Sequence, residues 1–346
     1  MLRVALIGCG GIGALRAKAL AALPSYRLAV VSDLVPGRAE ALATRHGATA
    51  VADWRAAVAD AGVDVVVVST PPSSHADVCL AALGAGKDVL CEKPLARSGE
   101  ESRIIVEAAR RAGRLIATGF NYRFYPSIVK AREVLDAGLI GRLDHIRSYA
   151  GYSATEHSQA WLHDAAVMGG GVLRDNGIHL IDLTRYFLGE VAEVTGFTSG
   201  AVWQFEGCED NGFALLRNEA GNIASLHASW TEWRGYRLLV EIYGTHGCIR
   251  AWCFPMMTEV LSAAERGGRT HRRRHLFPAT HLGERLWSYR WVVVRSFVRE
   301  LEALAGALRG ERNPLATGHD GLRAIEIAEA TALRQASRRP GYAQIV

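Results

Sequence analysis

Short apolar runs alternate with Ala-rich amphipathic segments over the first 120 residues. The run at 63–69 is almost continuously apolar, which is typical of a parallel strand buried on both faces. Strands are predicted at 2–7, 27–32, 63–69, 88–91 and 115–118, and helices at 11–22, 36–46, 73–85 and 98–112. Regular alternation of strand and helix predicts an α/β fold with a doubly wound parallel sheet of the Rossmann type.

The pattern changes after Gly119. A helix is predicted at 125–137, a strand at 143–151 and a helical segment at 172–188, and two long helical patterns at 282–309 and 320–337 close the chain. Between them, β-like runs follow one another without intervening helices, which predicts an antiparallel sheet. These runs lie at 191–205, 211–217, 222–230, 236–243 and 247–253. We therefore expect a Rossmann domain over 1–120 and an α+β domain with a large, mostly antiparallel open sheet over 121–346.

The first predicted strand runs into a glycine-rich turn. Gly8, Gly10 and Gly13 fit the pattern G-x-G-x-x-G, with Gly11 and Ile12 between the last two. The motif lies between a strand and a helix, where glycines allow a tight turn and close approach of backbone to a pyrophosphate. The free N–H groups of the following helix favour phosphate binding. We expect a dinucleotide site here, and the alternative is an ordinary glycine-rich turn.

An acidic residue ends the second predicted strand. Asp33 follows Gly13 by about twenty residues, the spacing of the carboxylate that binds the adenosine ribose. A carboxylate at this position repels a 2′-phosphate, so Asp33 favours NAD. Ser32 and Arg38 lie close in sequence and leave NADP as an alternative.

The overall charge is mildly basic, with a formal net charge of +5. Much of the excess lies in the stretch 266–275, which we interpret as a solvated loop, with contact to an anionic ligand or a second subunit as the alternative. No aromatic residues are interleaved there, so we expect no nucleic-acid partner. The six cysteines have no metal-type spacing, and no long apolar run or leader pattern is present. We expect reduced thiols, no metal, no membrane segment and a cytoplasmic location.

Two further clusters carry candidate chemistry. The first is Glu92-Lys93-Pro94 after the strand predicted at 88–91. Ligands of doubly wound sheets bind at the carboxyl ends of strands, so Lys93 is expected to point into the cofactor crevice. The alternative is a surface lysine.

The second cluster is Asp175, His179 and Asp182, spaced to lie on one face of a helix. A carboxylate beside a histidine suits acid/base chemistry, in which Asp175 orients the ring or grips a neighbouring hydroxyl. The alternatives are a helix cap with a core histidine, and a metal site.

Taken in order, these motifs resemble the glucose–fructose oxidoreductase/inositol dehydrogenase (Gfo/Idh/MocA) family over essentially the whole chain. The matching elements are Gly8–Gly13, Asp33, Ser69–His75, Glu92-Lys93-Pro94, Gly119–Arg123 and Gly169–Asp182. The resemblance implies an NAD(P)-dependent oxidoreductase that moves a hydride between the nicotinamide and a secondary alcohol or ketone. The implied substrate is a sugar, a cyclitol or a sugar derivative such as a nucleotide sugar or an amino sugar.

The resemblance also implies residue roles. Lys93, Asp175 and His179 form the expected catalytic group, with His179 as base and Lys93 polarising the alcohol oxygen or sharing the proton. Glu92 and Lys93 are expected by the nicotinamide ribose and the reacting carbon, and the Lys93–Pro94 bond is often cis in relatives. The expected cofactor contacts are Gly8, Gly10, Gly11, Ile12, Gly13, Asp33, Thr70, Pro71, His75, Glu92, Lys93 and Asn121.

Substrate contacts are expected from position alone. Some relatives carry Trp-Arg before the glycine run, whereas this chain has Trp161-Leu162, so no role passes to Leu162. The candidates are Arg123, Tyr149, Tyr152, His157, Trp161, Arg174 and Asn176.

Two other functions stay open at this point. Some relatives are glycoside hydrolases or lyases that oxidise the substrate transiently, and others are dinucleotide-binding sensors, against which Lys93, Asp175 and His179 argue. Relatives usually pair their open sheets face to face, so the strands between 191 and 253 are expected to form a homodimer or homotetramer.

Overall fold

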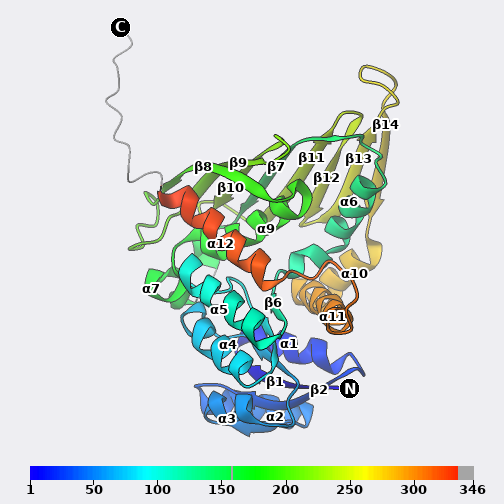
Figure 1. Ribbon diagram of the computed structural model, residues 1–346. Coiled ribbons are helices and arrows are strands. Elements are labelled where there is room, and N and C mark those ends of the chain that lie inside the picture. The colour runs from blue at the N-terminus through cyan, green and yellow to red at the C-terminus, as the bar shows by residue number, and fades with distance from the viewer. Residues whose placement is uncertain (157–158, 334–346) are drawn as a thin grey trace.

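The computed structural model describes residues 1–156 and 159–333, and two β-sheets with helices around and between them form its framework (Figure 1). The first sheet has six parallel strands in the order β3-β2-β1-β4-β5-β6. Its strands are β1 (Leu2–Ile7), β2 (Tyr26–Ser32), β3 (Thr49–Val51), β4 (Val65–Val68), β5 (Asp88–Cys91) and β6 (Ile116–Thr118). The prediction of a doubly wound Rossmann sheet is confirmed.

The helices of this part of the chain cover both faces of the parallel sheet, so every residue of β4 is buried. They are α1 (Gly11–Ala21), α2 (Pro36–His46), α3 (Trp54–Ala59), α4 (His75–Gly84) and α5 (Gly99–Ala112), with a short 3₁₀ turn, η1 (Pro72–Ser74), before α4. The short elements β3 and α3 were not predicted, because three to six residues are too few to show a hydrophobic period.

The second sheet has eight strands in the order β14-β13-β12-β11-β7-β10-β9-β8. Only the β10–β7 pair is parallel, so the expected mostly antiparallel open sheet is confirmed. The strands are β7 (Leu143–Gly151), β8 (Val191–Ser199), β9 (Asn211–Asn218), β10 (Ile223–Ser229), β11 (Arg237–Gly244), β12 (Gly247–Cys253), β13 (Met256–Ser262) and β14 (His271–Leu276). The strand predicted at 191–205 therefore ends earlier, and β13 and β14 were missed.

The basic stretch 266–275 is only partly the loop that its composition suggested. Its second half forms β14, the edge strand of the large sheet. Arg272 and Arg274 lie at alternate positions of the strand and contact the buried carboxylate of Glu259 on β13, at 2.5 and 2.9 Å. A partner carboxylate on the neighbouring strand explains why this basic segment pairs instead of staying solvated, and charged edge residues also discourage further strand addition.

Helices connect the two sheets. Between the sheets lie η2 (Asn121–Phe124), α6 (Pro126–Asp136), η3 (Ala154–Glu156), η4 (Ala160–His163), α7 (Ala165–Met168), α8 (Val172–Asp175) and α9 (Gly177–Leu188). The long pattern predicted at 282–309 is two helices, α10 (Pro278–Trp287) and α11 (Tyr289–Leu308), because the backbone at Ser288 takes a φ of 74°. The last helix is α12 (Gly318–Leu333). Within the described residues, no helix combines the length and apolar character that a membrane span requires.

The C-terminal helices return to the first sheet. Phe297, Leu301 and Leu304 of α11 bury their side chains in the same core as Val4 and Leu6 of β1. Figure 1 shows α11 beside α1, and α12 lying between α5 and the large sheet. The expected boundary at residue 120 therefore separates the two sheets, while α11 and α12 pack against both parts.

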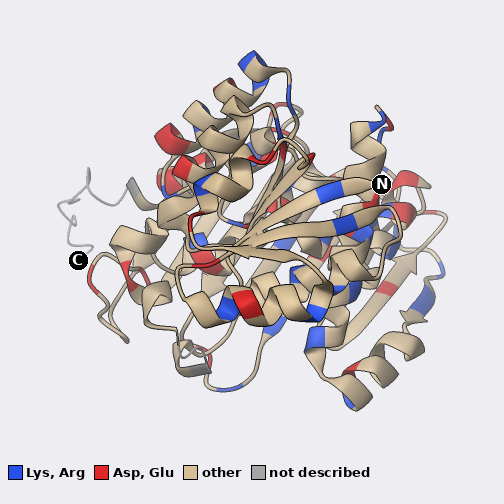
Figure 2. Cartoon of the chain, turned by 90° about the horizontal axis from the view of Figure 1, so that it is seen from below, with Lys and Arg blue, Asp and Glu red and all other residues tan. Residues whose placement is uncertain are grey.

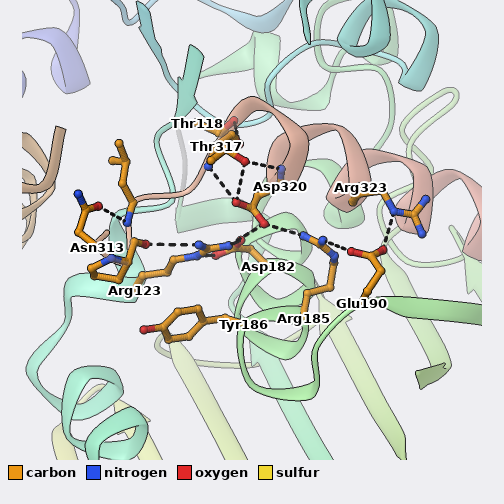
Figure 3. Close-up of polar contacts among 12 residues, drawn as sticks. Thr118, Arg123, Asp182, Arg185, Tyr186, Glu190, Asn313, Thr317, Asp320 and Arg323 are labelled. Carbon is orange, nitrogen blue, oxygen red and sulfur yellow. Dashed lines mark hydrogen bonds and ion pairs between the residues drawn. The ribbon is translucent and has the colours of Figure 1, made fainter. Parts of the chain in front are cut away.

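A buried ion-pair network connects η2, α9 and α12 (Figure 3). Arg123 forms a two-point contact with Asp182, with N···O distances of 2.5 and 2.9 Å, and also contacts Asp320 at 3.3 Å. Arg185 extends the network from Asp320 to Glu190. Both guanidinium groups are almost fully buried. The substrate role expected for Arg123 does not fit this position, since its guanidinium is committed to carboxylates, and we assign it a structural role.

Replacing Asp182 with asparagine is expected to lower the free energy of unfolding by about 3 kcal/mol, because it leaves a buried guanidinium without its main counter-charge. The matched control is Asp136→Asn, which breaks a half-exposed pair with Arg132 and should cost about 1 kcal/mol or less. Denaturant unfolding of the two variants measures the difference. Equal stability of the two variants would contradict a structural role for the Arg123–Asp182 pair.

Candidate active site

Lys93 and Asp175, 82 positions apart in the chain, meet at the carboxyl end of β5. Lys93 lies two residues after the end of β5, and Asp175 is the last residue of α8. The Lys93 ammonium donates to the backbone oxygen of Asp175 at 2.7 Å and to its Oδ1 at 3.1 Å. The Lys93–Pro94 peptide is cis, as the family resemblance implied. The structure therefore brings two of the three expected catalytic residues into direct contact.

The carboxylate of Asp175 is held by several donors. Its Oδ2 accepts hydrogen bonds from the Tyr152 hydroxyl and from Trp230 Nε1, the latter at 3.2 Å. The carboxylate of Asp175 thus grips a neighbouring hydroxyl, that of Tyr152, as one of its two expected roles requires. Asp175 ends α8, and His179 lies in the first turn of α9.

His179 lies in an aromatic setting. Its ring stacks on Tyr122, with centroids 4.0 Å apart and planes 4° apart, and Phe120 meets it edge-on. Burial, helped by the positive charge of Lys93, holds the pKa of His179 well below its ordinary value of 6.5, against a smaller opposite effect of Asp175. Its Nδ1 is buried and has no hydrogen-bond partner among the described residues. His179 is therefore a neutral imidazole at pH 7.

A chain of hydrogen bonds lies beside this ring. The Tyr236 hydroxyl donates to Asn176 Oδ1 at 2.7 Å, and the hydroxyls of Tyr122 and Tyr236 are 3.1 Å apart. Asn176 is buried, and within the described part of the chain its Nδ2 has no partner. Because Oδ1 is occupied, the amide keeps a free donor, which suits the substrate role expected for Asn176.

The glycine-rich turn fits a dinucleotide. Gly8 has a φ of +93°, and a Cβ there would lie 2.5 Å from the Ser69 carbonyl oxygen. A Cβ on Gly13 would lie 1.9 Å from the Gly8 carbonyl oxygen, so strand and helix approach too closely for a side chain. By contrast, positions 10 and 11 face open space, where backbone N–H groups can approach phosphates.

Asp33 is held beside this turn. Its Oδ2 accepts a hydrogen bond from the backbone N–H of Cys9 at 2.6 Å, and its Oδ1 from that of Val35 at 2.8 Å. The residues of the turn therefore fit the cofactor that the motif predicts, with the ribose-binding carboxylate in place. Ile12 follows in the first turn of α1, half-exposed.

The other predicted cofactor residues lie in the loops after β4 and β5. His75 is fully buried, with one ring nitrogen 2.9 Å from the Pro94 carbonyl oxygen and the other 2.9 Å from that of Thr70. It therefore connects the loop of Thr70 and Pro71 to the loop of Lys93, and we assign it a positioning role behind the cofactor loops. Glu92 and Asn121 contact Arg16 and Ser296, respectively.

The candidate substrate residues separate into two groups. Tyr152 and Asn176 lie at the site through the contacts above, and Trp161 is partly exposed in η4. The hydroxyl of Tyr149 contacts Glu232, and the ring packs on His227 across the sheet, whereas Arg174 pairs with Glu329. The polar groups of Tyr149 and Arg174 are thus paired with Glu232 and Glu329. His157 lies outside the described residues.

Three site residues were missed from the sequence. Tyr122 lies inside the recognised stretch Gly119–Arg123, so its position was a usable signal. Trp230 and Tyr236 flank the connection between β10 and β11, where no local pattern pointed to the site. No group of three or more His, Cys, Asp or Glu side chains suited to a metal is found in the described ranges.

Comparison with known proteins agrees with this geometry. Residues 2–120 match the family described as an oxidoreductase family with an NAD-binding Rossmann fold, and residues 128–250 match the GFO/IDH/MocA C-terminal domain. The chain is 31% identical to a levoglucosan dehydrogenase of Pseudarthrobacter phenanthrenivorans over 83% of each chain. It is 29% identical to an inositol 2-dehydrogenase of Rhizobium meliloti over 98% of each.

Solved structures support the same assignment. A levoglucosan dehydrogenase in complex with NADH and levoglucosan superposes with a TM-score of 0.83 at 28% identity, covering 95% of both chains. The match extends over both sheets, so the shared fold includes the site as well as the cofactor domain. The chain therefore belongs to the Gfo/Idh/MocA family of oxidoreductases and carries its NAD-binding Rossmann domain.

Proposed function

We propose that this protein uses NAD to oxidise a secondary hydroxyl of a sugar, cyclitol or sugar derivative, or to reduce the corresponding ketone. The observation that carries the proposal is the Lys93 ammonium anchored by Asp175 near a neutral His179, at the strand ends beside the dinucleotide turn. Levoglucosan and inositol, which name the two relatives above, are both rings with several hydroxyl groups.

Different residues of the chain carry out different steps in the oxidation of the alcohol. NAD, when bound, supplies the acceptor for the hydride that leaves the carbon atom. Lys93 donates a hydrogen bond to the alcohol oxygen and stabilises the negative charge that develops there. A ring nitrogen of His179 takes the hydroxyl proton, because the imidazole is neutral at working pH. Asp175 and Asn176 orient the substrate and the lysine. The products are the ketone, the reduced cofactor and one proton.

The test is the absorbance of reduced nicotinamide, with purified protein, NAD or NADP, and a panel of inositols, free and anhydro sugars, nucleotide sugars and amino sugars. A substrate-dependent rise supports the dehydrogenase proposal and identifies the substrate class. A flat trace with release of an aglycone would instead indicate transient oxidation by a hydrolase or lyase. Cofactor binding without any turnover, in either direction, would indicate a sensor.

Replacing Asp33 with alanine is expected to lower the preference for NAD over NADP by about tenfold in kcat/KM, because the repulsion of a 2′-phosphate is lost. The initial rates with each cofactor measure this ratio. Asp144→Ala, an exposed position on β7 of the other sheet, is the control and should leave the ratio unchanged. An unchanged ratio in Asp33→Ala would remove Asp33 from cofactor discrimination.

We further propose that two or four copies associate through the outer face of the large sheet. Phe197, Phe213 and Leu215 are 68%, 50% and 61% exposed there. Adjacent apolar side chains on an open sheet favour a protein interface, and light scattering after gel filtration tests it. A monomer would contradict the proposal.

The proposal also includes a small-molecule substrate, no nucleic-acid partner and a cytoplasmic location. Lys and Arg are scattered among Asp and Glu in the view of Figure 2, which supports a small-molecule substrate over nucleic acid. All six cysteines are free and buried, which suits a reducing cytoplasm.

A further inference from the structure

A buried cluster of three charged residues lies behind the expected nicotinamide end of the site. Arg16 of α1 is fully buried, and its Nε donates to Glu92 Oε1 at 2.6 Å. Its Nη1 contacts the carboxylate of Glu300 on α11, and its guanidinium carbon lies 3.6 Å from the centroid of the Phe297 ring. Side chains of α11 thus hold Arg16 on two sides, although α11 lies far outside the cofactor motif in sequence.

The cluster has more negative than positive charge. One guanidinium faces two carboxylates, and Glu300 is fully buried with an Oε1 that has no hydrogen-bond partner among the described residues. Burial, together with the nearby charge of Glu92 and against the opposing effect of Arg16, raises the pKa of Glu300 to about 7. The charged groups that face Glu300 are Arg16 on α1, Glu92 after β5 and, more weakly, Asp182 on α9. If packing were the only role of position 300, an apolar side chain could fill the space and avoid the cost of burying a second carboxylate.

The cluster is connected directly to the predicted active site. Glu92 immediately precedes Lys93, and its backbone N–H donates to the Val68 carbonyl oxygen at 2.9 Å. A Cβ on Gly119 would lie 2.8 Å from Arg16 Nη2 and 3.2 Å from Glu92 Oε2, so the cluster packs tightly against the end of β6. The Arg16 guanidinium is therefore packed against the residue that immediately precedes Lys93.

A second contact from the same helix supports this role. Ser296, about one turn before Glu300 on α11, accepts a hydrogen bond from Asn121 Nδ2 at 2.8 Å. Asn121 is one of the expected cofactor contacts, and the family resemblance implies a position for it near the nicotinamide end. Helix α11 thus holds Asn121 directly, through Ser296, and Glu92 indirectly, through Glu300 and Arg16.

We propose that Glu300 is a positioning residue: through Arg16 it fixes Glu92 and the Lys93 loop, and its charge favours the positively charged oxidised cofactor over the reduced one. The inference rests on the proposed NAD-dependent function. With Glu300 ionised, the cluster carries one net negative charge, which attracts an oxidised nicotinamide ring and has no such effect on the neutral reduced ring.

The test compares NAD and NADH binding to the apo protein by calorimetry or fluorescence, with no substrate present. Glu300→Gln is expected to raise the Kd for NAD about tenfold and to change the Kd for NADH less than about threefold. The matched control, Glu302→Gln, alters an exposed carboxylate of the same helix and should change neither. Equal changes for both cofactors, or none, would overturn the proposal.

If Glu300→Gln does not fold, the pH dependence of cofactor binding to the wild-type protein tests the proposal instead. Between about pH 8 and pH 6, wild-type affinity for NAD should fall as Glu300 gains its proton, while affinity for NADH stays nearly constant. A flat NAD affinity over this range would overturn the proposal. Wild-type protein that binds neither cofactor would refute the proposed function itself, so the two failures are distinguishable.

Discussion

Lys93→Ala is expected to lower kcat by about a thousandfold while leaving the Kd for NADH within about threefold of wild type. The ammonium is the donor placed to stabilise charge on the alcohol oxygen, and it contributes only when the reaction proceeds. We expect most of the cofactor affinity to come from the turn of Gly8–Gly13 and from Asp33, whose contacts do not involve Lys93. Steady-state rates with the substrate found in the panel, together with NADH fluorescence titration, measure both quantities.

The loss in Lys93→Ala should not come from unfolding. The carboxylate of Asp175 keeps the Tyr152 hydroxyl and Trp230 Nε1 as donors when the ammonium is removed. Lys18→Ala, at an exposed position of α1, is the control and should retain wild-type turnover. If Lys93→Ala turned over within tenfold of wild type, Lys93 would have no catalytic role.

His179→Gln is expected to lower kcat by a hundredfold or more, because glutamine keeps a polar group of similar reach but cannot accept the hydroxyl proton, a step worth about 10²–10⁴ in rate. Glutamine has no ring to stack on Tyr122, so the variant loses this contact and its folding must be checked separately. The measurement is kcat at saturating NAD, with the thermal unfolding midpoint as a check of folding. Turnover close to wild type in a folded variant would exclude His179 as the base.

The pH dependence of the wild-type enzyme gives an independent check. Burial and the charge of Lys93 hold the pKa of His179 well below 6.5, so the base stays unprotonated at neutral pH. Activity is therefore present above this lowered pKa and lost as the pH falls through it. At saturating NAD, we expect kcat to stay level from about pH 8 to pH 6.5 and to fall only at lower pH. A fall centred at or above pH 6.5 would contradict the assignment.

Local sequence patterns were enough to predict the residues expected to bind the cofactor. The spacing of Gly8, Gly10 and Gly13, their place between a strand and a helix, and the distance to Asp33 are local properties that the chain displays directly. Lys93 was also predictable, because it follows a strand of a doubly wound sheet and ligands bind at strand ends. The structure adds their geometry without changing their placement.

A residue's place in a motif was a less reliable guide to its role where its contact partners lie far away in the sequence. Arg123 lies in a recognised stretch, yet Asp182 and Asp320 bind its guanidinium. The basic segment 266–275 reads as a solvated loop until Glu259 of the neighbouring strand is placed beside it. In both cases the deciding partner is a carboxylate that no local spacing connects to the arginine.

The sequence by itself determined the Rossmann domain, the following antiparallel sheet and the family, since these depend on local periodicity and on motif spacing. The catalytic trio stays a prediction that the sequence made from its motifs. Only the tertiary structure decided what Asp175 binds, that burial lowers the pKa of His179, and that α11 returns to hold Arg16 and Asn121. Hydrogen-bond partners and desolvation arise from contacts between distant segments, and a linear pattern carries no record of which segments meet.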